Sequence, residues 1–179
     1  MRKRHVRTYS MNSVSPMGGT KRQRELAADV VEFCMSELMP RHRTLDIEVE
    51  LTKCFEKDGE ACCYPLENGL REFRIEIDHR IYKPFSKKWE DRKVVAVDPE
   101  YGYENYVTAL CHEMVHVWQW VSGILEDRVY PKKLGYRTLW KGKDYTKTPY
   151  SRQPWERQAY RMQEKLYKKY LTSPLTKVF

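Results

Sequence analysis

The segment TALCHEMVHVWQW, residues 108–120, places two histidines four positions apart, with a glutamate directly after the first. Residues four apart lie on the same face of an α-helix, so His112 and His116 can offer ring nitrogens to one metal ion. Glu113 lies about 100° around the helix from His112, at the flank of that face. There it can reach a water molecule on the metal. The spacing is that of H-E-x-x-H, which predicts a zinc-binding catalytic helix with Glu113 as general base. The alternative is an amphipathic helix with two histidines, each of which would need a buried hydrogen-bond partner.

The third ligand must come from elsewhere, because catalytic zinc usually has three protein ligands and an open position for water. No histidine follows His116, so the candidates are downstream carboxylates. Glu156 is favoured, since Pro154 fits the first turn of a helix and a buried stripe begins beside it. That stripe consists of Trp155, Ala159, Met162, Leu166 and Tyr170. Glu156 could instead serve only the helix N-terminus, through the dipole or a capping interaction with Gln153. Asp144, expected in a turn, is the second candidate for the ligand.

A peptidase site also needs a donor for the oxyanion of the tetrahedral intermediate. Tyr145, Tyr150 and Tyr160 lie near the predicted third ligand in the sequence, and Tyr150 is selected. The alternative is that all three are packing or surface residues.

The elements that must position these residues follow from periodicity. Thr20 can cap a first helix that ends before Pro40. Segments 45–51 and 72–78 alternate as half-buried strands, 93–98 is a short apolar strand, and another short strand is expected near ACCY at 61–64. Segment 82–92 is expected to be a basic loop, and a helix is expected from about residue 104 to 122, ended by Gly123. The order predicts an α+β domain with a small, mostly antiparallel sheet.

Length and composition limit the classes of protein to which the chain can belong. The chain has 179 residues, with 41% hydrophobic and 32% charged residues, which favours one soluble domain over a disordered chain or a membrane protein. We expect a domain at 21–179 after a flexible basic arm at 1–20, where no acidic residue occurs. No apolar segment follows the basic start, so no secretory signal is expected.

The five cysteines fit neither a disulfide framework nor paired zinc knuckles, which favours reduced thiols in the cytoplasm. Cys54, Cys62 and Cys63 could gather around a second metal, although adjacent cysteines poorly share one ion. The formal net charge of +8 attracts polyanions. Weak, sequence-independent nucleic-acid binding through the basic arm and segment 83–93 is therefore one hypothesis, and an ordinary solvated surface is the other.

Three segments together resemble the zincin metallopeptidases, specifically the small SprT-like proteins common in phages and prophages. They are VTALCHEMVHVWQ at 107–119, LWKGKDY at 139–145 and PYSRQPWERQAY at 149–160. The element order is similar over about 25–170, and the specific matches lie within 94–161. In SprT and Spartan proper the third ligand is a histidine, and a cysteine-rich zinc ribbon often follows. Neither is present here, and a glutamate ligand is instead similar to the gluzincins.

The resemblance implies an N-terminal helix over a twisted sheet, a catalytic helix beneath, and a C-terminal helix that brings the third ligand. It implies one Zn²⁺ held by His112, His116 and Glu156, and a peptide or protein substrate added as a strand at a sheet edge near the metal. Segments 72–78 and 93–98 are the candidate edges. The sequence thus predicts a zinc metallopeptidase. The alternatives are a protease acting on DNA-bound proteins and a non-catalytic zinc-binding protein, although the latter would have no use for Glu113.

Overall fold

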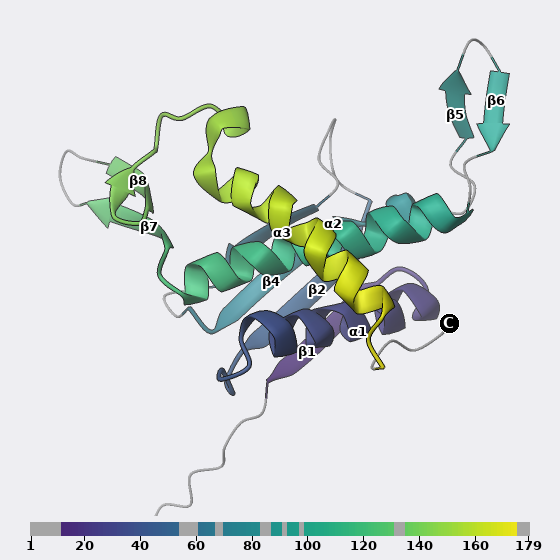
Figure 1. Ribbon diagram of the computed structural model, residues 1–179, viewed down its shortest axis with the longest axis horizontal. Coiled ribbons are helices and arrows are strands. Elements are labelled where there is room, and N and C mark those ends of the chain that lie inside the picture. Colours follow the sequence, from purple (N-terminus) through teal and green to yellow (C-terminus); the bar gives the residue numbers. More distant parts are fainter. Residues whose placement is uncertain are drawn as a thin grey trace, which may run out of the picture.

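The computed structural model describes residues 12–53, 61–66, 70–82, 87–90, 93–96, 99–130 and 135–174. Within these ranges the chain forms three α-helices and three β-sheets, so the predicted α+β class is confirmed. The helices are α1 (Lys21–Leu38), α2 (Pro99–Val121) and α3 (Pro154–Leu171). In Figure 1, α2 runs across the front of the main sheet, and α3 crosses in front of α2.

The main sheet has four strands in the order β1-β2-β4-β3. Its strands are β1 (Ser13–Gly18), β2 (Asp46–Thr52), β3 (Ala61–Pro65) and β4 (Glu72–Asp78). The β1–β2 and β2–β4 pairs are parallel, and only β3–β4 is antiparallel. The prediction of a mostly antiparallel sheet is therefore wrong for this sheet. The β1–β2 pair is parallel because the chain returns from β1 through α1, a helical crossover. The β2–β4 pair is parallel because the chain reverses twice between them, running back along β3, which lies on the far side of β4.

Strand β1 also shows that the N-terminal arm predicted from the sequence extends too far into the chain. Residues 1–11 lie outside the described residues, but 13–18 pair with β2 along their whole length. The sequence pattern did not predict this strand, because Pro16 interrupts it. Pro16 lies opposite Val49 in an edge strand, where proline is tolerated. Gly18 has φ +75°, and a Cβ there would lie 2.4 Å from the Leu51 carbonyl oxygen. The expected arm boundary at residue 20 is thus too late.

The predicted alternation of the two central strands is confirmed. Ile47, Val49 and Leu51 of β2 are buried, and so are the three apolar residues of β4: Phe73, Ile75 and Ile77. This face packs against the helices as one hydrophobic core. Burial of each such side chain contributes roughly 1.5–3 kcal/mol, so the sheet is a rigid support for α1 and α2.

The helix boundaries follow local signals. Thr20 caps α1 through a capping box with Gln23: its Oγ1 accepts from the Gln23 backbone N–H, and the Gln23 carboxamide accepts from the Thr20 N–H. Helix α2 begins at Pro99, five residues before the expected start, because proline suits a first helical turn. It ends before Gly123, whose φ of +69° is the left-handed conformation expected there.

Neither strand predicted as the substrate edge is an edge of the main sheet. Strand β4 lies between β2 and β3, and β6 (Lys93–Ala96) pairs with β5 (Lys87–Glu90) in a separate hairpin. Part of the segment expected as a basic loop is therefore β5. The edges are β1 and β3, the predicted short strand near ACCY, and β3 contacts α2.

The chain between α2 and α3 leads to the third predicted ligand. It forms a small sheet of β7 (Leu125–Tyr130), β8 (Gly135–Trp140) and β9 (Lys143–Asp144). A short 3₁₀ turn, η2 (Tyr150–Arg152), then enters α3. Among the described residues, none of the helices has the length and apolarity needed to cross a membrane.

Candidate metal centre

Helices α2 and α3 bring together three buried side chains that could bind a metal ion. His112 and His116 are on the central part of α2, and Glu156 is on the first turn of α3. Each of the three residues exposes only 8% of its surface. One ligand atom from each lies within 4.8 Å of the others, so this group can hold a metal ion.

The distances fit tetrahedral coordination. The two Nε2 atoms of His112 and His116 are 3.1 Å apart. Glu156 Oε2 lies 3.2 Å from His112 Nε2, and Oε1 lies 3.5 Å from His116 Nε2. A metal with bond lengths of about 2.0–2.1 Å separates its tetrahedral ligand atoms by about 3.3 Å. All three edges are close to that value.

Two glutamine side chains orient the imidazole rings. Gln163 Oε1 lies 2.6 Å from His112 Nδ1, and Gln119 Oε1 lies 2.8 Å from His116 Nδ1. A carbonyl oxygen can only accept, so each Nδ1 carries the hydrogen. In the neutral rings both Nε2 atoms then present lone pairs to each other and to Glu156. Three converging acceptors are satisfied by a cation or by protons between them, so the group can hold a metal ion.

The carboxylate of Glu156 is held in its charged form. Burial by itself would raise its pKa, but the contacts with His112 and His116, together with the hydrogen bond from Tyr150, outweigh burial and lower the pKa well below its ordinary value. A deprotonated carboxylate is the form that binds a metal.

Glu113 is the buried acid beside the group. It exposes 5% of its surface, and burial raises its pKa; His116 and His112 oppose the rise, and Glu156 adds to it. Burial and, after it, the charge of Glu113 also raise the pKa of Cys63, which places Glu113 near the edge strand β3. A raised pKa makes this carboxylate a stronger proton acceptor.

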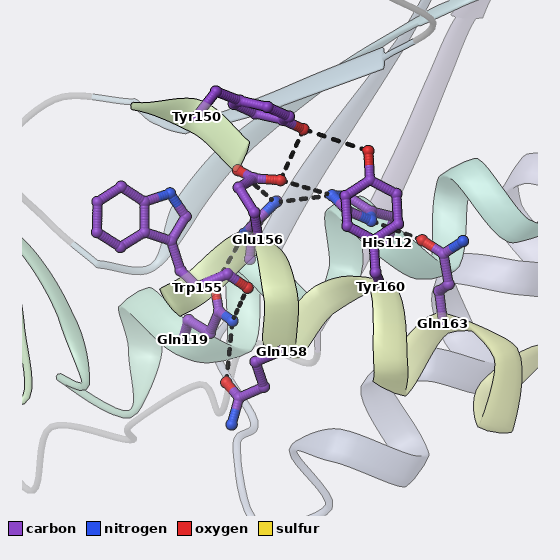
Figure 2. A network of polar contacts seen from close by, with 9 residues as sticks. His112, Gln119, Tyr150, Trp155, Glu156, Gln158, Tyr160 and Gln163 are labelled. Carbon is purple, nitrogen blue, oxygen red and sulfur yellow. Dashed lines mark hydrogen bonds and ion pairs between the residues drawn. The ribbon is translucent and has the colours of Figure 1, made fainter. Parts of the chain in front are cut away.

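Two tyrosines lie beside the three side chains. The Tyr150 hydroxyl donates to Glu156 Oε2 at 2.8 Å and lies 3.4 Å from the Tyr160 hydroxyl. The rings of Tyr160 and His112 pack edge to face, with their centroids 4.7 Å apart. Figure 2 shows Tyr150, Glu156 and His112 converging, with Tyr160 alongside. Both tyrosines are more than half exposed. Burial and the contacts with Tyr160 and Glu156 raise the pKa of Tyr150, so its hydroxyl remains a donor.

The competing assignments of the carboxylates are resolved by position. Asp144 is exposed, accepts from the Thr146 backbone and hydroxyl at 3.0 and 2.6 Å, and pairs with Arg137 at 3.1 Å. Gln153 makes no side-chain capping bond, and its amide donates to the Thr148 carbonyl oxygen instead. Glu156 faces the histidines, as predicted, and Asp144 lies outside the group.

The sequence analysis missed the two orienting glutamines. Gln119 follows His116 by three residues, and Gln163 follows Glu156 by seven, so each shares a helix face with a ligand. That spacing was the available signal, but which acceptor serves which ring depends on how α2 and α3 pack.

Within the described parts of the chain, His112, His116 and Glu156 form the one group of this kind. Cys34, Cys62, Cys63 and Cys111 are free thiols. The suggested second metal would also need Cys54, which lies outside the described residues. The basic residues at 2–7 and most of the basic segment at 83–93 also lie outside them. In comparisons with known proteins, no family model, no curated protein and no solved structure matches the chain.

Proposed function

We propose that the protein is a zinc-dependent peptidase with His112, His116 and Glu156 as metal ligands and Glu113 as general base. The observation that carries the proposal is the convergence of two Nε2 atoms and one carboxylate beside a second, buried carboxylate. A structural site has no use for Glu113, whereas hydrolysis requires a base.

The donor set favours zinc. Two imidazoles and one carboxylate are a common ligand set of catalytic zinc, which keeps a fourth position open. Here Tyr150 and Tyr160 contact Glu156 and His112, and their exposed fractions are 58% and 51%. A substrate can therefore approach from this side.

A bound zinc ion supplies two effects: it lowers the pKa of a water molecule to about 7 and polarises a carbonyl group. The residues of the chain do the rest. The Glu113 carboxylate accepts the proton of the attacking water and then donates it to the leaving amine nitrogen. Burial favours the first step, because it raises the pKa of Glu113 and so makes the carboxylate a stronger proton acceptor.

Tyr150 is the proposed donor to the oxyanion. Its hydroxyl already lies 2.8 Å from the ligand oxygen Glu156 Oε2, so it borders the coordination space. Since its pKa is raised, it keeps its proton while negative charge develops nearby. Tyr160 supports its orientation through the 3.4 Å contact of the two hydroxyls.

The substrate peptide is proposed to add as a strand along β3. This strand is the edge of the main sheet that contacts α2. The charge of Glu113 contributes to the raised pKa of Cys63 in this strand. A peptide paired to β3 would run past the general base. The earlier candidates, 72–78 and 93–98, do not offer such an edge.

The test is the Glu113→Gln variant. It should bind one equivalent of zinc as the unaltered protein does, but lose at least about a hundredfold in peptide cleavage, because an amide cannot accept the proton. Zinc content is measured by atomic emission, and cleavage is measured on unfolded casein. Glu104→Gln, an exposed position of the same helix, is the matched control and should keep full activity.

Three outcomes are informative. Activity of Glu113→Gln within a few-fold of the unaltered protein would remove Glu113 from the mechanism. Zinc binding without cleavage in the unaltered protein would favour a non-catalytic zinc protein. Tyr150→Phe should lower cleavage with zinc affinity nearly unchanged, since it removes a donor and no ligand.

A further inference from the structure

The fully buried glutamine of the catalytic helix has a role that the peptidase mechanism does not assign. Gln119 exposes none of its surface, and its amide makes three hydrogen bonds. Its Oε1 accepts from His116 Nδ1, and its Nε2 donates to the Trp155 carbonyl oxygen at 3.1 Å and to Gln158 Oε1 at 2.9 Å. Figure 2 shows this amide beneath the first turn of α3.

The bonds of the amide nitrogen determine which way the amide points. Both partners of Nε2 are acceptors, so the NH₂ group must face them, and the carbonyl oxygen must face His116. His116 then carries its hydrogen on Nδ1, and its Nε2 lone pair points at the metal position. The orientation of this ligand is thus set from outside the coordination sphere.

The same amide also holds the element that carries the third ligand. Trp155 immediately precedes Glu156, and its carbonyl oxygen is bound by Gln119. Trp155 is itself buried against Trp140 and Tyr145. A single side chain therefore connects His116 on α2 with the backbone of the turn that presents Glu156.

We propose that Gln119 is a positioning residue that couples the second and third metal ligands, fixing the tautomer of His116 while anchoring the first turn of α3. A glutamine is required for both tasks. A carboxylate at this position could accept from Nδ1 but could not donate to the Trp155 carbonyl oxygen, and leucine could do neither. The inference rests on the metal site of the proposed function.

The test compares zinc affinity, measured by competition with a chelator, in variants of the full chain. Gln119→Met keeps the volume but removes both functions, and it should weaken zinc binding by about 10–100-fold. Gln119→Glu keeps the acceptor for Nδ1, so its affinity should lie between those of Gln119→Met and the unaltered protein. Gln158→Met is the matched control: it removes one acceptor of the amide and leaves the bond to His116, so affinity should change by less than about threefold.

A spectroscopic measurement separates positioning from mere packing. Long-range ¹H–¹⁵N spectra of the zinc-loaded protein should show His116 with a hydrogen on Nδ1 and zinc on Nε2, and Gln119→Met should lose this pattern. Zinc affinity within threefold and an unchanged tautomer in Gln119→Met would overturn the proposal. If that variant does not fold, the spectrum of the unaltered protein decides: ligation through Nδ1 of His116 overturns it, and ligation through Nε2 supports it. Absence of zinc binding in the unaltered protein would instead refute the metal site itself.

Discussion

Helix α3 carries two buried polar clusters with opposite chemistry. At its C-terminal end, the Tyr170 hydroxyl donates to Asp29 Oδ2 of α1 at 2.6 Å, a donor matched to an acceptor. At its N-terminal end, Glu156 meets the Nε2 atoms of His112 and His116, where acceptors face acceptors. Both clusters are buried and both join α3 to another helix.

The difference separates a structural contact between two helices from a candidate metal site. A matched pair such as Tyr170 and Asp29 is satisfied within the protein and ties two helices together. A group of converging lone pairs is satisfied only by a cation or by protons. The orienting bonds from Gln119 and Gln163 keep the lone pairs pointing inward. Burial alone therefore does not distinguish the two clusters, whereas a surplus of acceptors marks the one that could hold a metal ion.

The largest expected effect is loss of a histidine ligand. His112→Ala or His116→Ala should weaken zinc binding by roughly a thousandfold, about a third of the 10–16 kcal/mol typical of a full zinc site. Zinc affinity is measured by chelator competition. Asp29→Asn, at the matched pair, is the control and should bind zinc as the unaltered protein does. Full zinc affinity in either histidine variant would place the metal elsewhere.

The next effect separates the two carboxylates. Glu156→Ala should weaken zinc binding by about a hundredfold, because it removes a charged ligand held on a packed helix. Asp144→Ala should leave zinc affinity unchanged. Among the described residues, the Asp144 carboxylate contacts Thr146 and Arg137, which both lie outside the metal centre. The two titrations are run side by side. The reverse order of affinities would mean that Asp144 is the ligand.

Chelation should affect the two ends of α3 differently. Zinc at a hundred times its dissociation constant should stabilise the protein by about 2.7 kcal/mol. Hydrogen exchange should show that removal of zinc by a chelator increases opening near Glu156 more than near Tyr170. Equal changes at both ends would show that the clusters are not independent.

Breaking the matched pair should cost stability and leave the metal in place. Tyr170→Phe leaves a buried acceptor on Asp29 without this donor, and the free energy of unfolding should fall by about 1–3 kcal/mol. Urea titration measures the loss, and zinc affinity should stay within about twofold. A large loss of zinc affinity in this variant would show that the Tyr170–Asp29 contact and the metal centre are not independent.

The smallest effect concerns a polar contact close to solvent. Hydrogen bonds from Arg80 lower the pKa of Asp78, although its burial opposes this. The contact therefore stabilises the fold above the unfolded pKa of about 3.9, and the stabilisation is lost as pH falls through the lower folded value. Arg80 is half exposed, so the loss should stay within about 1 kcal/mol. Urea titrations of the unaltered protein and Asp78→Asn between pH 6 and 2 should converge at the acid end. A constant difference across this range would rule out this linkage.

Local patterns determined much of this protein. The i, i+4 spacing of His112 and His116 places them on one face of any helix, and Pro154 sets the start of the helix that bears Glu156. The strict alternation of 45–51 and 72–78 predicted both central strands. These features depend on neighbours in the chain, so the sequence alone is sufficient for them.

Tertiary structure decided what depends on distant partners. Strand β1 has no clear pattern because Pro16 interrupts it, and only its pairing with β2 reveals it. The order of strands makes β3 an edge and β4 a central strand, because β4 pairs with β2 on one side and with β3 on the other. Glu156 and Asp144 are both plausible ligands in sequence, and the packing of α3 on α2 brings Glu156 alone of the two to the histidines. The roles of Gln119 and Gln163 likewise arise only when two helices meet, because a hydrogen bond between them requires both partners in place.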